Sequence, residues 1–304
     1  VMIDDTVYIC KTNAEELLGC AVKGYVSESR GSEDEIVFIS ENTDKNRSLK
    51  IPADNIEGFS DNRLRYLNNY PYSNKIQSAD IDKKADMIYN FKAKVPFDAS
   101  VFNLKNGYVN LIDNDNDGVY EVVSVCEYIN YVVSYKDSSN MILSDYYGKP
   151  SIKLDESEVN YRITNGESDM KFDDIAEGDV VSVMADGVIR NFGIAETDMA
   201  ASTILRLVVS KNQIIGEVTG VNSLKNIIYI DGREWFFDKD YISLAERGTA
   251  IIPEIGMRYE FRTDGENKIC DVRYAKESDM AYALIVGAES DKNGLSEKVY
   301  LKLL

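Results

Sequence analysis

The chain has 304 residues, of which 44% are hydrophobic and 28% are charged, a composition typical of folded globular domains rather than of disordered chains. Its 52 acidic and 34 basic side chains give a net charge of −18, which disfavours nucleic acid and anionic lipid as partners. The acidity favours divalent cations, although solubility alone also accounts for it. No histidine occurs, which excludes serine–histidine and cysteine–histidine catalysis within this chain, and no apolar run approaches the roughly 20 residues that span a bilayer.

Short stretches rich in Val, Ile, Tyr and Phe, separated by Gly, Asn and Asp, predict β-strands along the whole chain. In Ile269–Tyr274 the polarity alternates from residue to residue, as it does on a sheet with one face in water. The expected strands are Val22–Val26, Glu35–Ser40, Ser48–Ile51, Met87–Ala93, Tyr108–Ile112, Tyr120–Val125, Ile129–Tyr135, Val180–Met184, Ile214–Thr219, Asn226–Ile230, Arg258–Arg262 and Ile269–Tyr274.

Helical periodicity is scarce. The segments Asn13–Gly19 and Asp61–Asn68 each predict one or two helical turns, too short for a crossover helix between parallel strands. We therefore predict an all-β fold of tandem small antiparallel β-barrel or β-sandwich-like modules with few short helical turns. Tight hairpin turns are expected at Asp186-Gly187, Asp231-Gly232 and Asp264-Gly265, because glycine accepts positive φ without strain.

The breaks between strands suggest five parts. These are a small β-barrel at 1–70, a sheet module with an acidic hairpin loop at 80–137, β modules at 138–199 and 200–277, and a strand pair at 278–304. In the last part, Ala281–Ala288 and Glu297–Leu304 are the expected strands. The final strand must pair within its module, with a neighbouring subunit or with further sequence, since an unpaired edge is a template for another strand.

One motif carries specific chemistry, the acidic loop Asp113–Glu121. Carboxylates stand at its positions one, three, five and nine (Asp113, Asp115, Asp117 and Glu121), and glycine stands at position six. Alternate residues of a loop wrapped around a point converge on it, and calcium needs six to eight oxygen ligands. Val119 would add its backbone carbonyl at position seven. The motif predicts a structural Ca²⁺ site, although position twelve is Ser124 instead of glutamate and both flanks are strands.

Other residues allow weaker hypotheses. The cysteines (Cys10, Cys20, Cys126 and Cys270) lack zinc-site spacing and are expected to be buried thiols, with a Cys10–Cys20 disulfide as the alternative. Carboxylate pairs such as Asp173/Asp174 and those within Glu33–Glu35 could serve a glycosidase only across a cleft, and such pairs are common in so acidic a chain. We predict no catalytic residues and no enzyme.

Aromatic residues could instead form a platform for sugar rings. The best candidates are Trp235-Phe236-Phe237 and Tyr146-Tyr147. Aromatic side chains in strands are more often core residues or cross-strand partners, and for Trp235 we expect a core position.

Three segments carry a family resemblance: LIDNDNDGVYEVVSVCEY with the following INYVV, the phrase IYIDGREW, and the ending AYALIVGAESDKNGLSEKVYLKLL. They resemble the tandem β-module region of large secreted clostridial (Firmicute) surface proteins that contain S-layer homology domains. The resemblance implies an extracellular, cell-surface protein whose calcium-type hairpin is the Asp113 loop. It brings no catalytic residues, and the sequence contains no S-layer homology module itself.

These observations together predict a non-catalytic structural or assembly segment of a bacterial cell-surface, S-layer-associated protein, stiffened by a bound calcium ion. Its expected partners are neighbouring modules or copies of the same protein, with cell-wall polysaccharide as a further partner, and neither nucleic acid nor membrane insertion. The alternative is a carbohydrate-binding module that uses exposed aromatic residues.

Overall fold

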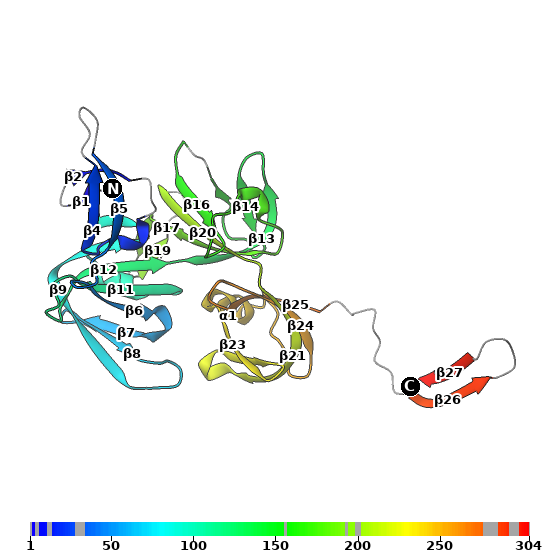
Figure 1. The fold of residues 1–304 in the computed structure, drawn as a ribbon. Coiled ribbons are helices and arrows are strands. Elements are labelled where there is room, and N and C mark those ends of the chain that lie inside the picture. The colour runs from blue at the N-terminus through cyan, green and yellow to red at the C-terminus, as the bar shows by residue number, and fades with distance from the viewer. Residues whose placement is uncertain are drawn as a thin grey trace. The chain divides into compact units, whose positions relative to one another are not determined.

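The computed structural model describes residues 2–3, 6–10, 14–27, 34–154, 157–191, 194–197, 202–275, 285–291 and 298–303 (Figure 1). Two compact units comprise Val1–Arg273 and Tyr274–Leu304. The prediction of an all-β fold is confirmed: within the described residues, α1 (Lys239–Glu246) is the one α-helix, and the remaining helical turns are short 3₁₀ segments. No helix of this described part is long and apolar enough to cross a membrane.

The first large sheet places the acidic hairpin. Its strands, in spatial order, are β6 (Arg47–Pro52), β11 (Gly107–Asp113), β12 (Tyr120–Glu127), β9 (Ile76–Tyr89), β8 (Arg63–Leu67) and β7 (Ile56–Ser60), with β10 (Lys92–Val95) paired to β9. Val109 and Leu111 point into the core, whereas Tyr108 and Asn110 between them are only partly buried. This alternation follows from the two-residue period of a strand.

Two expectations for short helical turns had different outcomes. Asn13–Gly19 contains the 3₁₀ turn η1 (Glu15–Leu17), and Gly19 follows it with φ +82°. The helical prediction for Asp61–Asn68 is wrong, because this segment forms a turn and strand β8. Asp61 and Asn62 both have positive φ and make a two-residue hairpin turn, and burial then alternates along β8 with period two.

The second large sheet follows directly from the first, since β13 begins two residues after β12 ends. Its strands, in spatial order, are β15 (Ile152–Lys153), β14 (Ile142–Asp145), β13 (Ile129–Asp137), β17 (Val180–Ala185), β20 (Ile204–Ser210) and β16 (Asn160–Thr164). Val181, Val183 and Leu205 lie in its core, while Ser182 and Arg206 alternate with them.

The third region is a closed barrel. Its strands, in spatial order, are β21 (Gln213–Asn222), β22 (Ile227–Ile230), β23 (Arg233–Phe237), β25 (Lys268–Tyr274) and β24 (Arg258–Thr263). β23 and β25 are parallel, β21 and β24 are antiparallel, and α1 stands between β23 and β24 in the chain. This strand order, with a helix after the third strand, is the topology of the OB-fold. Tyr241 of α1 contributes to the barrel core.

Small sheets complete the described chain. β3 (Ile9–Cys10), β5 (Glu35–Glu41) and β4 (Val22–Ser27) form one, and the strand pairs are β1 (Met2–Ile3) with β2 (Thr6–Val7), β18 (Val188–Asn191) with β19 (Ile194–Thr197), and β26 (Ile285–Asp291) with β27 (Lys298–Leu303). The terminal strand β27 thus pairs within its own unit, with β26.

The sheets cross the expected module boundaries. β6 from 1–70 pairs with β11 from 80–137, and β13 continues into the sheet of β14 and β17. β20, from 200–277, belongs to that second sheet and not to the barrel. Loop-forming residues mark where strands end, but long-range pairing decides which strands share a sheet. The described sheets also contain parallel pairs, for example β9–β12 and β16–β20, so they are mixed rather than purely antiparallel.

Of the three Asp-Gly turns, Asp231-Gly232 has positive φ at both residues, +47° and +77°, and joins β22 to β23 as a two-residue hairpin turn. Asp264-Gly265 also lies in a tight hairpin turn as expected, because β24 and β25 are neighbours in the barrel and the N–H of Asn267 donates to the carbonyl of Asp264 at 3.1 Å. The positive φ falls on Asn267, at +64°, and not on Gly265. The prediction for Asp186-Gly187 is wrong, because β17 pairs with β13 and β20 whereas β18 pairs with β19. The side chains of Asp186 and Asp264 are both buried and accept backbone N–H groups.

Candidate functional site

The acidic loop connects β11 to β12 and wraps around the carboxylate of Asp113, which is 1% exposed. Its Oδ1 accepts hydrogen bonds from the backbone N–H of Asp115 at 3.2 Å and of Asn116 at 2.6 Å, and its Oδ2 accepts from Gly118 at 3.0 Å. Asn116 and Gly118 have φ of +66° and +91°, so the chain turns sharply at both. The buried carboxylate therefore organises the loop from inside.

The four carboxylates named from the sequence lie together. Asp113, Asp115, Asp117 and Glu121 each place one oxygen so that all four oxygens lie within 4.8 Å of one another. Glu121 Oε2 also accepts the N–H of Asn114 at 2.7 Å. Such a convergence of oxygens suits calcium, and without a cation the charges repel one another. Calcium itself stays a prediction.

The structure also shows where positions seven and twelve of the motif, Val119 and Ser124, lie. Val119 lies in the loop and donates its N–H to Asp117 Oδ1 at 2.7 Å, while the contribution of its carbonyl to a metal site stays a prediction. Ser124, at the position of the usual bidentate glutamate, is inside β12 opposite Asn110. The strand therefore carries position twelve away from the loop, and Glu121 is the last acidic side chain of the cluster.

The loop also holds the N-terminal segment. Asn114 donates to the carbonyl of Gly19 at 3.1 Å and accepts from the N–H of Ala21 at 3.3 Å. Asn116 donates to the carbonyl of Asp44 at 2.9 Å. Beside these contacts, Leu18 and Cys20 pack on a small cluster formed by Ile88, Ile112 and Val122 on β9, β11 and β12. An ordered acidic loop thus fixes residues on both sides of β4 and β5.

A second polar cluster lies where the barrel meets the two large sheets; we call it the seam network. It contains Asn106, Tyr128, Asn130, Asp238 and Asp264. Asp238 Oδ2 accepts from Asn106 at 2.7 Å and from Asn130 at 3.0 Å, and Asn130 also donates to Asp264 Oδ2 at 3.0 Å. Tyr128 donates to the same Asp264 oxygen at 3.2 Å. All five side chains are buried.

The remaining oxygens of the seam network bind backbone. Asp238 is the N-cap of α1, accepting from Asp240 and Tyr241, and Asp264 Oδ1 accepts from Glu266 and Lys268. Burial raises the pKa of Asp238 and of Asp264.

Cys270 lies near both of these carboxylates, and the three groups could in principle hold a metal. The thiol contacts the carbonyl of Lys268 at 3.3 Å, and its burial raises its pKa well above the ordinary value. Because amide, hydroxyl and backbone donors already occupy the carboxylates, we interpret the network as a structural joint rather than a metal centre.

Four further contacts join the barrel region to the first sheet and its loops. Asp54 binds Lys268 at 2.8 Å and Lys239 at 2.9 Å. Burial acts to raise the pKa of Asp54, but the two ammonium groups outweigh it and lower that pKa. Glu234 of β23 accepts from the Tyr72 hydroxyl, and Lys225, in the turn before β22, donates to the carbonyl of Pro71 at 3.3 Å.

The weaker sequence hypotheses are resolved in part. None of the four cysteines, all of them in described positions, forms a disulfide, so Cys10 and Cys20 are not joined. Both are only half-buried, whereas Cys126 and Cys270 are buried as expected. Asp174 caps the turn η4 (Phe172–Asp174) by accepting the N–H of Lys171 at 3.0 Å. Glu33 lies outside the described residues.

The aromatic candidates do not form one platform. Trp235 packs against the barrel core as expected, and Phe237 stacks on Tyr241 with ring centroids 5.5 Å apart. Tyr147 packs on the same core and donates to Asp271 at 2.6 Å. Tyr146 is 56% exposed, and its ring lies at 87° to that of Tyr147, beside the guanidinium of Arg273.

Comparisons with known proteins name no family. No family model matches the chain, and no curated protein matches it. Among solved structures, drosophila Unr CSD456 is 12% identical, with 76% of this chain and 98% of that chain covered and a TM-score of 0.20. A likeness at that TM-score supports no conclusion about fold or function.

Proposed function

We propose that this chain is a non-catalytic structural segment of an extracellular bacterial surface protein, and that a calcium ion bound at Asp113, Asp115, Asp117 and Glu121 stiffens it. The observation that supports the proposal most directly is the convergence of these four carboxylates in a loop that also holds the N-terminal segment. Family resemblance supports the surface location. Neighbouring modules or copies of the same protein are the proposed partners.

The calcium ion would act on stability through the loop. Four carboxylates in close proximity repel one another, and a divalent cation converts this repulsion into attraction. An ordered loop keeps Asn114 and Asn116 in place, and these side chains bind Gly19, Ala21 and Asp44. Calcium would therefore order the β3–β5–β4 sheet as well as the loop.

The barrel contacts favour a spacer role. OB-fold barrels commonly bind ligands on the face of their second and third strands and at two neighbouring loops. Here Glu234 on the third strand, Lys225 before the second strand and Asp264 after the fourth strand all contact other parts of the same chain. That surface is therefore engaged in joining the barrel to the sheets.

The test is calcium titration by calorimetry on the whole chain, with thermal melting in calcium and in chelator, for the wild type and Asp115→Ala. One bound ion is expected, with a gain of about 2.7 kcal/mol at a free calcium concentration 100 times the Kd. Hydrogen exchange should slow at residues 19–21 and 44–46. Asp115→Ala should lose all three effects, because it removes a ligand.

Asp137→Ala is the matched control. Asp137 starts another exposed turn and accepts the N–H groups of Ser139 and Asn140, but it belongs to no carboxylate cluster of the described residues. This variant should keep the full calcium response. The calcium site would be rejected if the wild type showed no calcium heat and no melting shift. It would also be rejected if the wild type and Asp115→Ala responded to calcium equally.

A further inference from the structure

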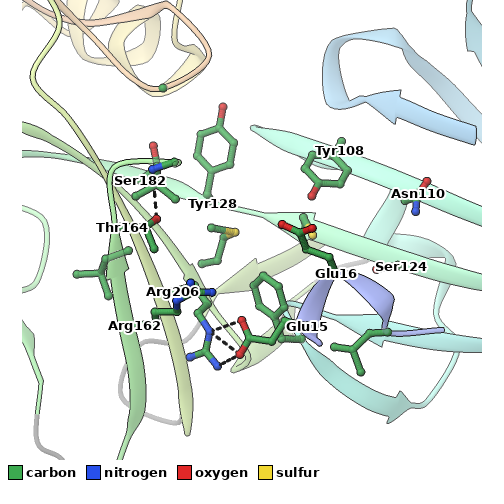
Figure 2. A pocket seen from close by; sticks show the side chains of 18 of the residues that line it. Glu15, Glu16, Tyr108, Asn110, Ser124, Tyr128, Arg162, Thr164, Ser182 and Arg206 are labelled. Carbon is green, nitrogen blue, oxygen red and sulfur yellow. Dashed lines mark hydrogen bonds and ion pairs between the residues drawn. The ribbon is translucent and has the colours of Figure 1, made fainter. Parts of the chain in front are cut away.

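A cavity of about 520 Å³ lies between the polar faces of the two large sheets. Tyr108, Asn110 and Ser124 line it from β11 and β12, and Thr164 and Ser182 line it from β16 and β17 (Figure 2). These side chains alternate with the core residues of each strand, so both sheets present their polar faces to the cavity. The turn η1 and the loop after β24 also contribute to its lining.

The positive charges at this cavity are already neutralised. Arg206, 9% exposed, forms a bidentate ion pair with Glu15, with both carboxylate oxygens 3.0 Å from its Nε. Its Nη1 donates to the carbonyls of Asn160 and Leu205, each at 2.9 Å. Arg162 donates its Nε to Asp169 at 2.7 Å. A phosphate or carboxylate ligand would find no uncommitted guanidinium here, so the cavity disfavours anions.

The remaining polar groups suit hydroxyls. Within the described part of the chain, the side chains of Asn110 and Ser124 have no hydrogen-bond partner, and an amide both donates and accepts. Glu16 points toward Tyr108 in Figure 2, and its carboxylate can accept hydrogen bonds. Burial, then Cys126, with which the hydroxyl forms a hydrogen bond, and the carboxylates of Glu266 and Glu16 raise the pKa of Tyr108, so its hydroxyl stays protonated.

Apolar surface completes the cavity. The rings of Tyr108, Tyr128 and Phe91 line it, together with Leu18 and Ile88. Phe91 also lies 5.5 Å from the Arg206 guanidinium, which holds that ring in position. Ligand cavities of a few hundred Å³ typically combine such an apolar lining with a few placed polar groups. A molecule with an apolar face and several neutral hydroxyls matches both features.

We propose that this cavity binds an uncharged sugar, one or two pyranose rings in size. The C–H face of a ring would lie on Tyr128, or on the face of Tyr108 opposite the Lys50 ammonium, which lies 3.6 Å from the Tyr108 ring centroid. The hydroxyls of the sugar would bind Asn110, Ser124 and Glu16. None of the four carboxylates of the acidic loop lines the site, and neither does any of the aromatic residues to which the sequence pointed. It also differs from the barrel surface, since it is formed mainly by the two large sheets.

The test is ligand-observed NMR and calorimetry on the whole chain with glucose, galactose, N-acetylglucosamine and the disaccharides cellobiose and chitobiose. At least one of them should bind with a Kd of 10 mM or tighter, an order-of-magnitude limit for a weak, specific small-ligand site. Glucose 6-phosphate should bind more weakly than glucose, because the arginines are committed. No binding by any of the five sugars, or tighter binding of the phosphate, would overturn the proposal.

Variants localise the site. Asn110→Ala should weaken binding about tenfold through one lost hydrogen bond, and Ser124→Phe should abolish it by filling the cavity. Tyr135→Leu is the matched control, since Tyr135 is 60% exposed and does not line the cavity. Binding that survives both cavity variants, with melting temperatures showing each to be folded, would place the sugar elsewhere and reject this assignment.

Discussion

Two loops of this protein each start at a buried aspartate that accepts backbone hydrogen bonds, but different side chains surround the two aspartates. Asp113 is the last residue of β11, and Asp264 directly follows β24. Both are at most 1% exposed and accept hydrogen bonds from N–H groups of the next few residues. Around Asp113 the neighbouring side chains are further carboxylates. Around Asp264 they are the amide of Asn130 and the hydroxyl of Tyr128.

The difference shows two ways in which the oxygens of a buried aspartate can find partners. Neutral donors from other elements complete the hydrogen bonding of Asp264, and the result is a joint between the barrel and the sheets. The Asp113 loop gathers carboxylates that lack such donors and retains oxygens for a cation. The hydrogen bonds of Asp264 should contribute to stability with or without calcium. The stabilising effect of the Asp113 carboxylate cluster should depend on calcium.

The largest expected effect is that of Asp264→Ala. It removes the acceptor of the N–H groups of Glu266 and Lys268 and one acceptor of the buried Asn130 amide, which also donates to Asp238. The Tyr128 hydroxyl keeps its second acceptor, Glu266, at 3.0 Å. We expect a loss of about 3 kcal/mol in the free energy of unfolding, measured by urea denaturation. The loss should be equal in calcium and in chelator. A loss below about 1 kcal/mol, or one that calcium restores, would mean that the seam network contributes little.

The next effect separates two roles inside the acidic loop. Asp113→Ala removes the acceptor of three backbone N–H groups and should cost about 2 kcal/mol in chelator. Asp115→Ala, an exposed position, should stay within about 0.5 kcal/mol of the wild type in chelator. Both variants should lose calcium binding. Equal unfolding free energies for the two in chelator would show that Asp113 does not organise the empty loop.

The comparison also explains what the sequence could reveal. The Asp113 motif spans nine residues, so spacing alone brought its four carboxylates together as candidates. The seam network joins Asn106, Asn130, Asp238 and Asp264 across more than 100 residues of sequence, and no local pattern marks such a pairing. Asp238 before the helix was a usable local signal, since aspartate is a favoured N-cap.

The sequence predicts where strands lie better than it predicts which strands pair. Period-two alternation located most central strands, whereas the parallel pairs β9–β12 and β16–β20 depend on contacts between distant segments. The cavity shows the same limit. Alternation indicates that Tyr108 and Asn110 face away from the core of the first sheet, but only the fold shows that Ser182 and Arg206 of the second sheet line the same cavity.

The smallest expected difference concerns pH. Because burial raises the pKa of Asp264 and Asp238 above the ordinary value of about 3.9, the folded state binds protons at these groups before the unfolded state does. Their contribution to stability should rise as pH falls through the folded-state pKa and be complete below about 3.9. Asp54 has the opposite sign: its lowered pKa gives stability that is present above about 3.9 and lost as pH falls through the folded value.

Titration of the Asp carboxyl carbons by ¹³C NMR measures these shifts directly. The resonances of Asp238 and Asp264 should change above the ordinary pKa, and that of Asp54 below it. Asp137 serves as an internal control, because its hydrogen bonds with Asn140 lower its pKa without any contribution from the seam network. If Asp264 titrates at or below the ordinary value, the donors of Asn130 and Tyr128 outweigh its burial. The seam network would then gain stability from ionised carboxylates and weaken in acid, reversing the sign expected here.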